Sequence, residues 1–176
     1  MKRRLMLALL ASSFPAVFLA QAKPDVKPDQ VVRLWFDRWN ALDGSEQSIN
    51  QLLELYRPDA FHQVGPNARQ IGSVSYEGHK AIRKMIGDFV KANKDIAFKI
   101  QAASGNEKGS ELFFVTEGPW GGSSVAVQYV GTYTGRTDNH RWTYPGAAFF
   151  QVQDGKIRGV RLIADREEPI EAQPPK

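Results

Sequence analysis

The chain of 176 residues contains no cysteine, and this absence excludes several classes of chemistry at once. Disulfide scaffolds, thiolate zinc sites, iron–sulfur clusters and cysteine nucleophiles all need a thiol, and so does a lipid anchor on an N-terminal cysteine. A disordered chain is also excluded, because 42% of the residues are hydrophobic and 24% are charged. We therefore expect one globular domain.

The part of the chain after residue 22 also lacks a large excess of charge of one sign. Residues 1–22 combine three basic residues, an apolar run from Leu5 to Ala20 and the small-x-small sequence Ala20-Gln21-Ala22, which is the layout of a secretory signal peptide. Cleavage after Ala22 removes three of the 23 basic residues and none of the 19 acidic ones, which lowers the formal net charge from +4 to +1. Such a balance disfavours nucleic acid as a partner.

Beyond residue 22 the sequence has no second apolar run of membrane-spanning length. We therefore expect a periplasmic or secreted protein with no stable membrane insertion after cleavage, and an uncleaved N-terminal anchor is the alternative. Proline and charge patterns predict a linker over residues 23–28, one domain over residues 29–165 and a disordered tail over residues 166–176.

Apolar spacing predicts three helices followed by strands. The first helix starts at Asp29, the second is capped by Ser48 and closed by Arg57-Pro58-Asp59, and the third follows Gly78. A strand is expected from Ala60 to Val64, and the alternating pattern from Ile96 onward predicts four or five antiparallel strands, with the clearest hairpin signal at Asp154-Gly155. Helices and a meandering sheet together describe an α+β domain in which a curved sheet wraps around the helices.

Four short motifs occur in order along the domain. They are Trp39-Asn40-Ala41-Leu42-Asp43-Gly44, Leu55-Tyr56-Arg57-Pro58-Asp59-Ala60, Gly78-His79-Lys80-Ala81-Ile82-Arg83, and Asp154-Gly155-Lys156-Ile157 with Arg161 and Asp165 after it. Together they resemble the SnoaL-like branch of the nuclear transport factor 2 superfamily. This resemblance implies a cone-shaped α+β barrel, with three N-terminal helices against a curved antiparallel sheet, a pocket between them and often a dimer that packs sheet against sheet.

The resemblance alone does not fix the function, because members of this superfamily isomerise steroids, hydrolyse epoxides, cyclise polyketides or bind small ligands. The resemblance to the ketosteroid isomerases implies that their general-base Asp corresponds to Val64, that their oxyanion-stabilising Tyr falls near Arg38 and that their protonated Asp falls near Gly146 or Ala147. In the epoxide hydrolases a carboxylate follows the Arg of the last strand, whereas here Leu162 follows Arg161. Apolar side chains cannot transfer protons, so these known chemistries are disfavoured.

His62 is the best remaining candidate for an acid or base in a pocket. It precedes Val64 by two residues and therefore shares its face of the strand, and an imidazole titrates near physiological pH. A hydrogen-bonded histidine at the edge of the barrel is the alternative. Because His62, His79 and His140 lack the spacing of metal ligands, we expect no metal and no other cofactor.

Aromatic side chains form the second candidate site. With Val64 they are the expected ligand-binding residues, although filling of the core is the commoner role of such rings. Two lie one helical turn apart and the others lie in alternating strands: Trp35, Trp39, Tyr129, Tyr133, Trp142 and Tyr144.

Three functions fit these residues. The leading hypothesis is a module that binds a small hydrophobic or aromatic molecule in the barrel pocket. The first alternative is an isomerase, dehydratase or cyclase in which His62 is the acid or base and Tyr133, Trp142 or Tyr144 donates hydrogen bonds. The second is a dimeric interaction module that uses the outer face of the sheet, where we expect Arg161 and Asp165 to lie.

Overall fold

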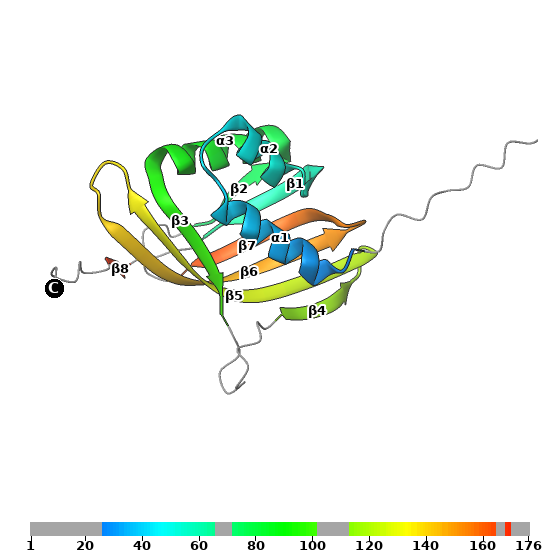
Figure 1. Cartoon of the computed structure of the whole chain (residues 1–176). Helices are drawn as coiled ribbons and strands as arrows, with labels where there is room; N and C mark the ends of the chain where they lie inside the picture. Colours follow the sequence, from blue (N-terminus) through cyan, green and yellow to red (C-terminus); the bar gives the residue numbers. More distant parts are fainter. Residues whose placement is uncertain (1–25, 66–71, 102–112, 165–167, 170–176) are drawn as a thin grey trace, which may run out of the picture.

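The computed structural model describes residues 26–65, 72–101 and 113–164 and the backbone of residues 168 and 169. Figure 1 shows three helices on the concave side of a strongly curved sheet. The helices are α1 (Pro28–Asn40), α2 (Glu46–Leu53) and α3 (Gly78–Ala92). The strands are β1 (Tyr56–Val64), β2 (Val74–Glu77), β3 (Asn93–Ile100), β4 (Phe113–Gly118), β5 (Gly122–Gly135), β6 (Arg141–Gln153), β7 (Lys156–Ala164) and β8 (Glu168–Pro169).

The sheet has the strand order β2-β1-β7-β6-β5-β3, with β4 also paired to β5 and β8 to β6. This architecture confirms the predicted α+β class. One pair differs from the expected antiparallel pattern, because β1 runs parallel to β7.

The tail prediction was wrong at Glu168 and Pro169, whose backbone pairs with Thr143 and Trp142 of β6. The predicted signal peptide and Asp165 lie outside the described residues, and within these residues no helix is long and apolar enough to cross a membrane.

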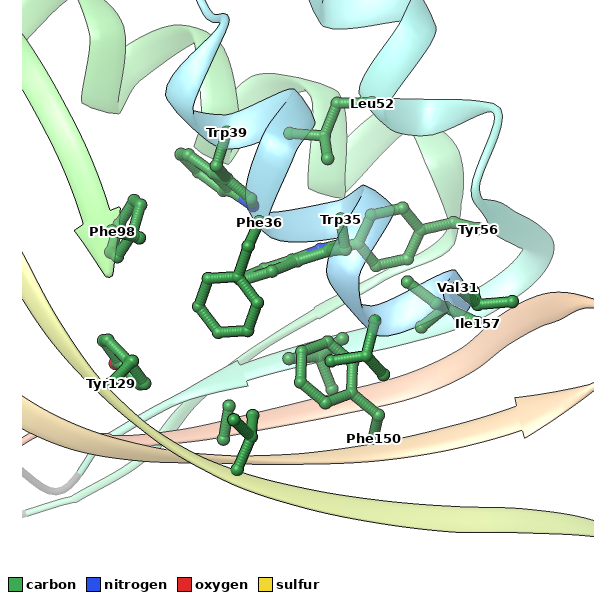
Figure 2. Close-up of a cluster of buried hydrophobic side chains, with 14 of the residues drawn as sticks. Val31, Trp35, Phe36, Trp39, Leu52, Tyr56, Phe98, Tyr129, Phe150 and Ile157 are labelled. Carbon is green, nitrogen blue, oxygen red and sulfur yellow. The ribbon is translucent and has the colours of Figure 1, made fainter. Parts of the chain in front are cut away.

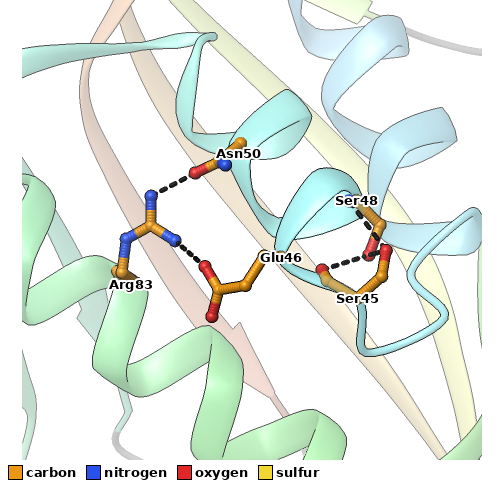
Figure 3. Close-up of polar contacts among 5 residues, drawn as sticks. All are labelled: Ser45, Glu46, Ser48, Asn50 and Arg83. Carbon is orange, nitrogen blue, oxygen red and sulfur yellow. Dashed lines mark hydrogen bonds and ion pairs between the residues drawn. The ribbon is translucent and has the colours of Figure 1, made fainter.

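The predicted starts of two helices were wrong, by one residue for α1 and by three residues for the cap of α2. Helix α1 begins at Pro28 rather than Asp29, because proline suits the first helical position, where a backbone N–H has no partner inside the helix. Helix α2 is capped by Ser45, not Ser48: the Ser45 hydroxyl accepts a hydrogen bond from the Ser48 backbone N–H over 3.1 Å (Figure 3). Gly44, with φ +87°, turns the chain directly before this cap.

Polar contacts fasten α2 to α3 at the surface. Arg83 of α3 donates to Glu46 Oε2 over 2.8 Å and also to the Asn50 side chain, both on α2 (Figure 3). These contacts hold the short helix α2 against α3 above the sheet, where its buried side chains Ile49, Leu52 and Leu53 join the core.

Strand β1 begins earlier than the sequence indicates. The segment Arg57-Pro58-Asp59, predicted to close a helix, belongs to β1. Its pairing with β7 is irregular between Tyr56 and Phe61, and a proline is tolerated there because the ladder is interrupted. The hairpin prediction is confirmed, since Asp154 and Gly155 connect β6 to β7 with φ +53° and +69°.

Side chains alternate between the two faces of the sheet. On β6, Ala148, Phe150 and Val152 are buried against the helices, whereas Phe149 is exposed on the other side. Figure 2 shows how rings from α1, β3, β5 and β6 fill the space between helices and sheet. We refer to the face that the helices cover as the concave face and to the opposite one as the convex face.

Candidate functional site

His62 lies on the concave face of β1 and is only 1% exposed. Its Nδ1 atom is 2.9 Å from the Tyr56 hydroxyl, and the Trp35 indole N–H donates to the same hydroxyl over 2.6 Å. Trp35 comes from α1, whereas Tyr56 and His62 come from the two ends of the irregular part of β1. Figure 2 shows the Trp35 and Tyr56 rings meeting between helix and sheet. We refer to these three residues as the relay.

The relay fixes the protonation pattern of His62. An indole nitrogen can only donate, so the Tyr56 oxygen accepts from Trp35. The arrangement in which the buried Tyr56 proton also has a partner is the one in which it is donated to His62 Nδ1. Nδ1 is then the acceptor, which assigns the proton of the neutral ring to Nε2. Burial lowers the pKa of His62 from its ordinary 6.5 to about 3, so the ring stays neutral at physiological pH. Burial also raises the pKa of Tyr56, which stays protonated.

The Nε2 atom of His62 is buried and has no hydrogen-bond partner among the described residues. A buried donor without a partner costs about 1–3 kcal/mol. The indole nitrogen of Trp39, one helical turn from Trp35 on α1, is in the same situation. Two of the residues singled out from the sequence therefore hold unpaired donors near the Trp35 ring, whose centroid lies 6.2 Å from that of His62 and 5.6 Å from that of Trp39.

The concave face becomes partly exposed beyond His62. Val64 follows on β1 and is paired with Leu162 of the parallel strand β7, and both are half-buried. On the same end of the sheet the rings of Phe89 and Tyr133 lie 5.7 Å apart, and both are also half-buried. We call five half-buried apolar side chains the concave rim: Val64, Leu162, Phe89, Tyr133 and Met85, the last of which lies one turn before Phe89 on α3. All of them except Val64 are among the partly buried residues that pack against the core.

The predicted ligand-binding residues all lie on the concave side, but at different depths. Tyr133 and Trp142 are half-buried, and Val64 belongs to the concave rim. The remaining four are buried members of the aromatic core: Trp35, Trp39, Tyr129 and Tyr144. Three cavities lined by described residues have volumes of about 500, 440 and 480 Å³, and none of the predicted ligand-binding residues lines them.

Gly146 illustrates what replaces the carboxylate of the isomerase relatives. A Cβ atom at this position would lie 2.7 Å from the Tyr129 hydroxyl oxygen, so the phenol occupies the space that a side chain at 146 would need. Burial raises the pKa of Tyr129, which keeps the phenol protonated. Arg38, where the isomerases carry a tyrosine, donates to Gln51 over 2.9 Å instead. Among the described residues the buried polar side chains are His62, Asn93 and Thr134, and none is a carboxylate.

Tyr56 is the site residue that the sequence interpretation missed, since the segment that follows it, Arg57-Pro58-Asp59, was expected to close a helix. Both Tyr56 and His62 are buried, but the register of β1 shifts between Tyr56 and Phe61, so simple alternation along the strand does not connect the two residues. The other histidines lie elsewhere: His79 is 3.1 Å from the Tyr56 backbone oxygen, and His140 is exposed beside Asp138. The described part of the chain holds no group of three or more potential metal ligands.

The family model of the SnoaL-like domain matches residues 32–160, which include most of α1, the relay and the sheet as far as the middle of β7. The chain belongs to this SnoaL-like family. No curated protein matches it.

Solved structures resemble this SnoaL-like domain in fold. A proposed aromatic ring hydroxylase from Novosphingobium aromaticivorans is 18% identical, with a TM-score of 0.59 over 81% of this chain and 90% of that one. A proposed polyketide cyclase from Xanthomonas campestris pv. campestris is also 18% identical, with a TM-score of 0.52 over 77% and 87%. A protein of ketosteroid isomerase-like fold from Catenulispora acidiphila, solved with trimethylamine, is 13% identical, with a TM-score of 0.54 over 80% and 85%. At these identities the likeness establishes the fold and not the activity.

Proposed function

We propose that this SnoaL-like domain binds a small hydrophobic or aromatic molecule on the concave face, between the concave rim and the relay. The unpaired, buried Nε2 of His62 carries the proposal, because a donor held in an apolar core is normally satisfied by a partner. The concave rim, which includes Val64 two residues after His62 on β1, supplies the kind of apolar surface that small-molecule sites use.

Adjacent residues of β7 provide a matched test. Leu162 belongs to the concave rim, whereas Ile163 is 40% exposed on the convex face. We expect the parent protein to bind 2-ethylnaphthalene in equilibrium dialysis, Leu162→Trp to weaken this binding about tenfold or more by filling the rim, and Ile163→Trp to leave it unchanged. Absence of binding by the parent, or equal effects of both substitutions, would contradict the proposal.

An enzyme of the isomerase, dehydratase or cyclase class is the second candidate. One observation favours it: His62 is a neutral, inward-facing N–H donor positioned by Tyr56, and such a donor can stabilise an enolate-like oxygen. The test is exchange of the α-protons of 2-tetralone in deuterated buffer, followed by proton NMR. Enzymatic function requires the parent to accelerate exchange over buffer and His62→Phe to lose the acceleration. Exchange at the buffer rate would leave binding as the function.

A homodimer formed through the convex face is the third candidate. A groove of about 500 Å³ crosses this face, and its apolar side chains Phe114, Phe149 and Ile163 are 60%, 45% and 40% exposed. Exposed apolar surface of this kind often marks an interface. Sedimentation should show a dimer that Phe149→Glu dissociates and that Lys80→Glu on α3 does not. A monomeric parent would exclude this candidate.

We also propose that the domain acts outside the cytoplasm, in the periplasm or the medium. The support is the signal-peptide layout of residues 1–22. The intact mass of the protein recovered from a periplasmic fraction should correspond to a chain that begins at Lys23. Recovery of the full-length chain from the cytoplasm alone would contradict this proposal.

A further inference from the structure

We propose that the cavity between α2, α3 and the turn after β5 binds a small, free phosphate monoester, a dianion that carries a short apolar group. This cavity has a volume of about 440 Å³. It is separate from the concave face, so the inference does not depend on the function proposed for that face. Three features support it: two cations without an acidic partner, an apolar floor and a glycine that leaves the cavity open.

The charged side chains around the cavity leave an excess of positive charge. Four basic and two acidic side chains line it. Both acidic side chains are already paired with a base. Glu46 accepts from Arg83 over 2.8 Å (Figure 3), and Asp88 pairs with Lys84 over 2.5 Å. The other two bases form no ion pair with a described acidic residue, so the cavity has two uncompensated positive charges, which a dianion balances.

These two bases are Lys91 and Arg136, and the backbone holds them side by side. The Arg136 backbone N–H donates to the Ala92 carbonyl over 2.8 Å, and its Nε donates to the Val90 carbonyl over 3.2 Å, so the two contacts bracket Lys91. Nε also donates to the Asn93 carbonyl over 3.0 Å. The terminal guanidinium nitrogens and Lys91 Nζ have no hydrogen-bond partner among the described residues. A guanidinium edge beside an ammonium group suits the oxygens of a phosphate.

The floor of the cavity is apolar, and one wall lacks a side chain. Ile49 of α2 and Val90 of α3 line the cavity and are each 5% exposed. Gly87, in the interior of α3, also lines it, and a Cβ atom there would meet no other atom within 4 Å. A glycine destabilises the interior of a helix relative to alanine, and no close neighbour requires one here. Gly87 therefore leaves room for an apolar group beside the charged one.

Two probes of the same shape test the charge of the ligand. Butyl phosphate is a dianion at about pH 8, because the second pKa of a phosphate monoester is about 6, whereas butyl sulfate carries one charge. In isothermal titration calorimetry we expect the parent protein to bind butyl phosphate about tenfold more tightly than butyl sulfate, and also more tightly than inorganic phosphate, which lacks the apolar group. Absence of butyl phosphate binding, or equal affinity for either comparison probe, would overturn the inference.

Three substitutions on α3 test the location of the site. Lys91→Gln removes an uncompensated charge and Gly87→Leu fills the cavity, so each should weaken butyl phosphate binding about tenfold or more. Lys80→Gln is the matched control, because Lys80 is exposed on the same helix and does not line the cavity. Gly87→Leu should unfold at no lower temperature than the parent, since leucine favours a helix. Equal weakening by Lys80→Gln and Lys91→Gln would overturn the assignment of the site.

A measurement on the unmodified protein locates the ligand without any substitution. In backbone amide NMR, butyl phosphate should shift the resonances of Gly87 and Arg136 and leave that of His62 unchanged. The reverse pattern would place the phosphate on the concave face and overturn the inference. Retention of the protein on phosphatidylcholine vesicles that contain phosphatidic acid, without binding of butyl phosphate, would assign the phosphate to a lipid headgroup and overturn the assignment to a free molecule.

Discussion

The concave and convex faces of the sheet belong to the same strands, but the hydrogen bonds of their polar side chains differ in their exposure to solvent. On the concave face Tyr56 and His62 are buried, and their hydrogen bonds run within the core and leave one donor unpaired. On the convex face Gln63 accepts from Arg161 over 2.7 Å and donates to Ser73 over 2.6 Å in contact with solvent. Water can satisfy an unpaired donor on the convex face, whereas a donor buried on the concave face has no such partner.

The largest expected difference between the faces concerns two neighbouring phenylalanines. Phe150 is 1% exposed and packs against Trp35, whereas Phe149 is 45% exposed on the convex face. We expect Phe150→Ala to lower the free energy of unfolding by about 3–5 kcal/mol, because it leaves a cavity among rings. Phe149→Ala should change it by less than about 1 kcal/mol. Urea denaturation of both variants measures the difference, and similar losses would contradict the assignment of the two faces.

The pH dependence of stability sharpens the comparison for His62. Its pKa is lowered from 6.5 to about 3 in the folded protein, so the unfolded chain takes up a proton between these values that the folded protein does not. The contribution of His62 is therefore lost as the pH falls below 6.5. Between pH 7.5 and 4.5 the loss amounts to about 3 kcal/mol.

The control for this prediction uses a solvent-exposed histidine. Urea denaturation at the two pH values should show a smaller acid-induced loss of unfolding free energy for His62→Gln than for the parent. His140→Gln should behave like the parent, because His140 is exposed. The same pH dependence in all three proteins would show that His62 is not buried as a neutral ring.

The relay itself is the next test. Tyr56→Phe removes one hydroxyl and leaves both the Trp35 indole N–H and His62 Nδ1 without a partner in the core. We expect a loss of about 2 kcal/mol in the free energy of unfolding. Gln63→Ala, which breaks two hydrogen bonds on the convex face, should cost less than about 0.5 kcal/mol because water replaces them. Equal costs in thermal or urea unfolding would remove the distinction between the faces.

Local patterns predicted the faces of the sheet well, since alternation depends only on the strand itself. His62 and Val64 share the concave face as expected, and Arg161 lies opposite Val160 and Leu162. The role of Tyr56 could not be predicted in the same way. Its strand is set by parallel pairing with β7, which is distant in sequence, and Pro58 in between indicates a turn. The unpaired state of His62 Nε2 is likewise a property of packing among α1, β1 and β6, and no local sequence pattern encodes it.

The smallest expected difference concerns two glycines that lie beneath rings on opposite faces. A Cβ atom at Gly146 would come as close as 2.6 Å to the Tyr129 side chain, and one at Gly159 would come as close as 2.3 Å to the Phe61 ring. Tyr129 is 2% exposed and cannot move without displacing Phe36 and Phe98, whereas Phe61 is half-buried on the convex face and can rotate toward solvent. We expect Gly146→Ala to cost about 1–2 kcal/mol and Gly159→Ala clearly less. Thermal unfolding of both variants checks this order, and the reverse order would mean that the Tyr129 ring yields more easily than its packing among aromatic neighbours implies.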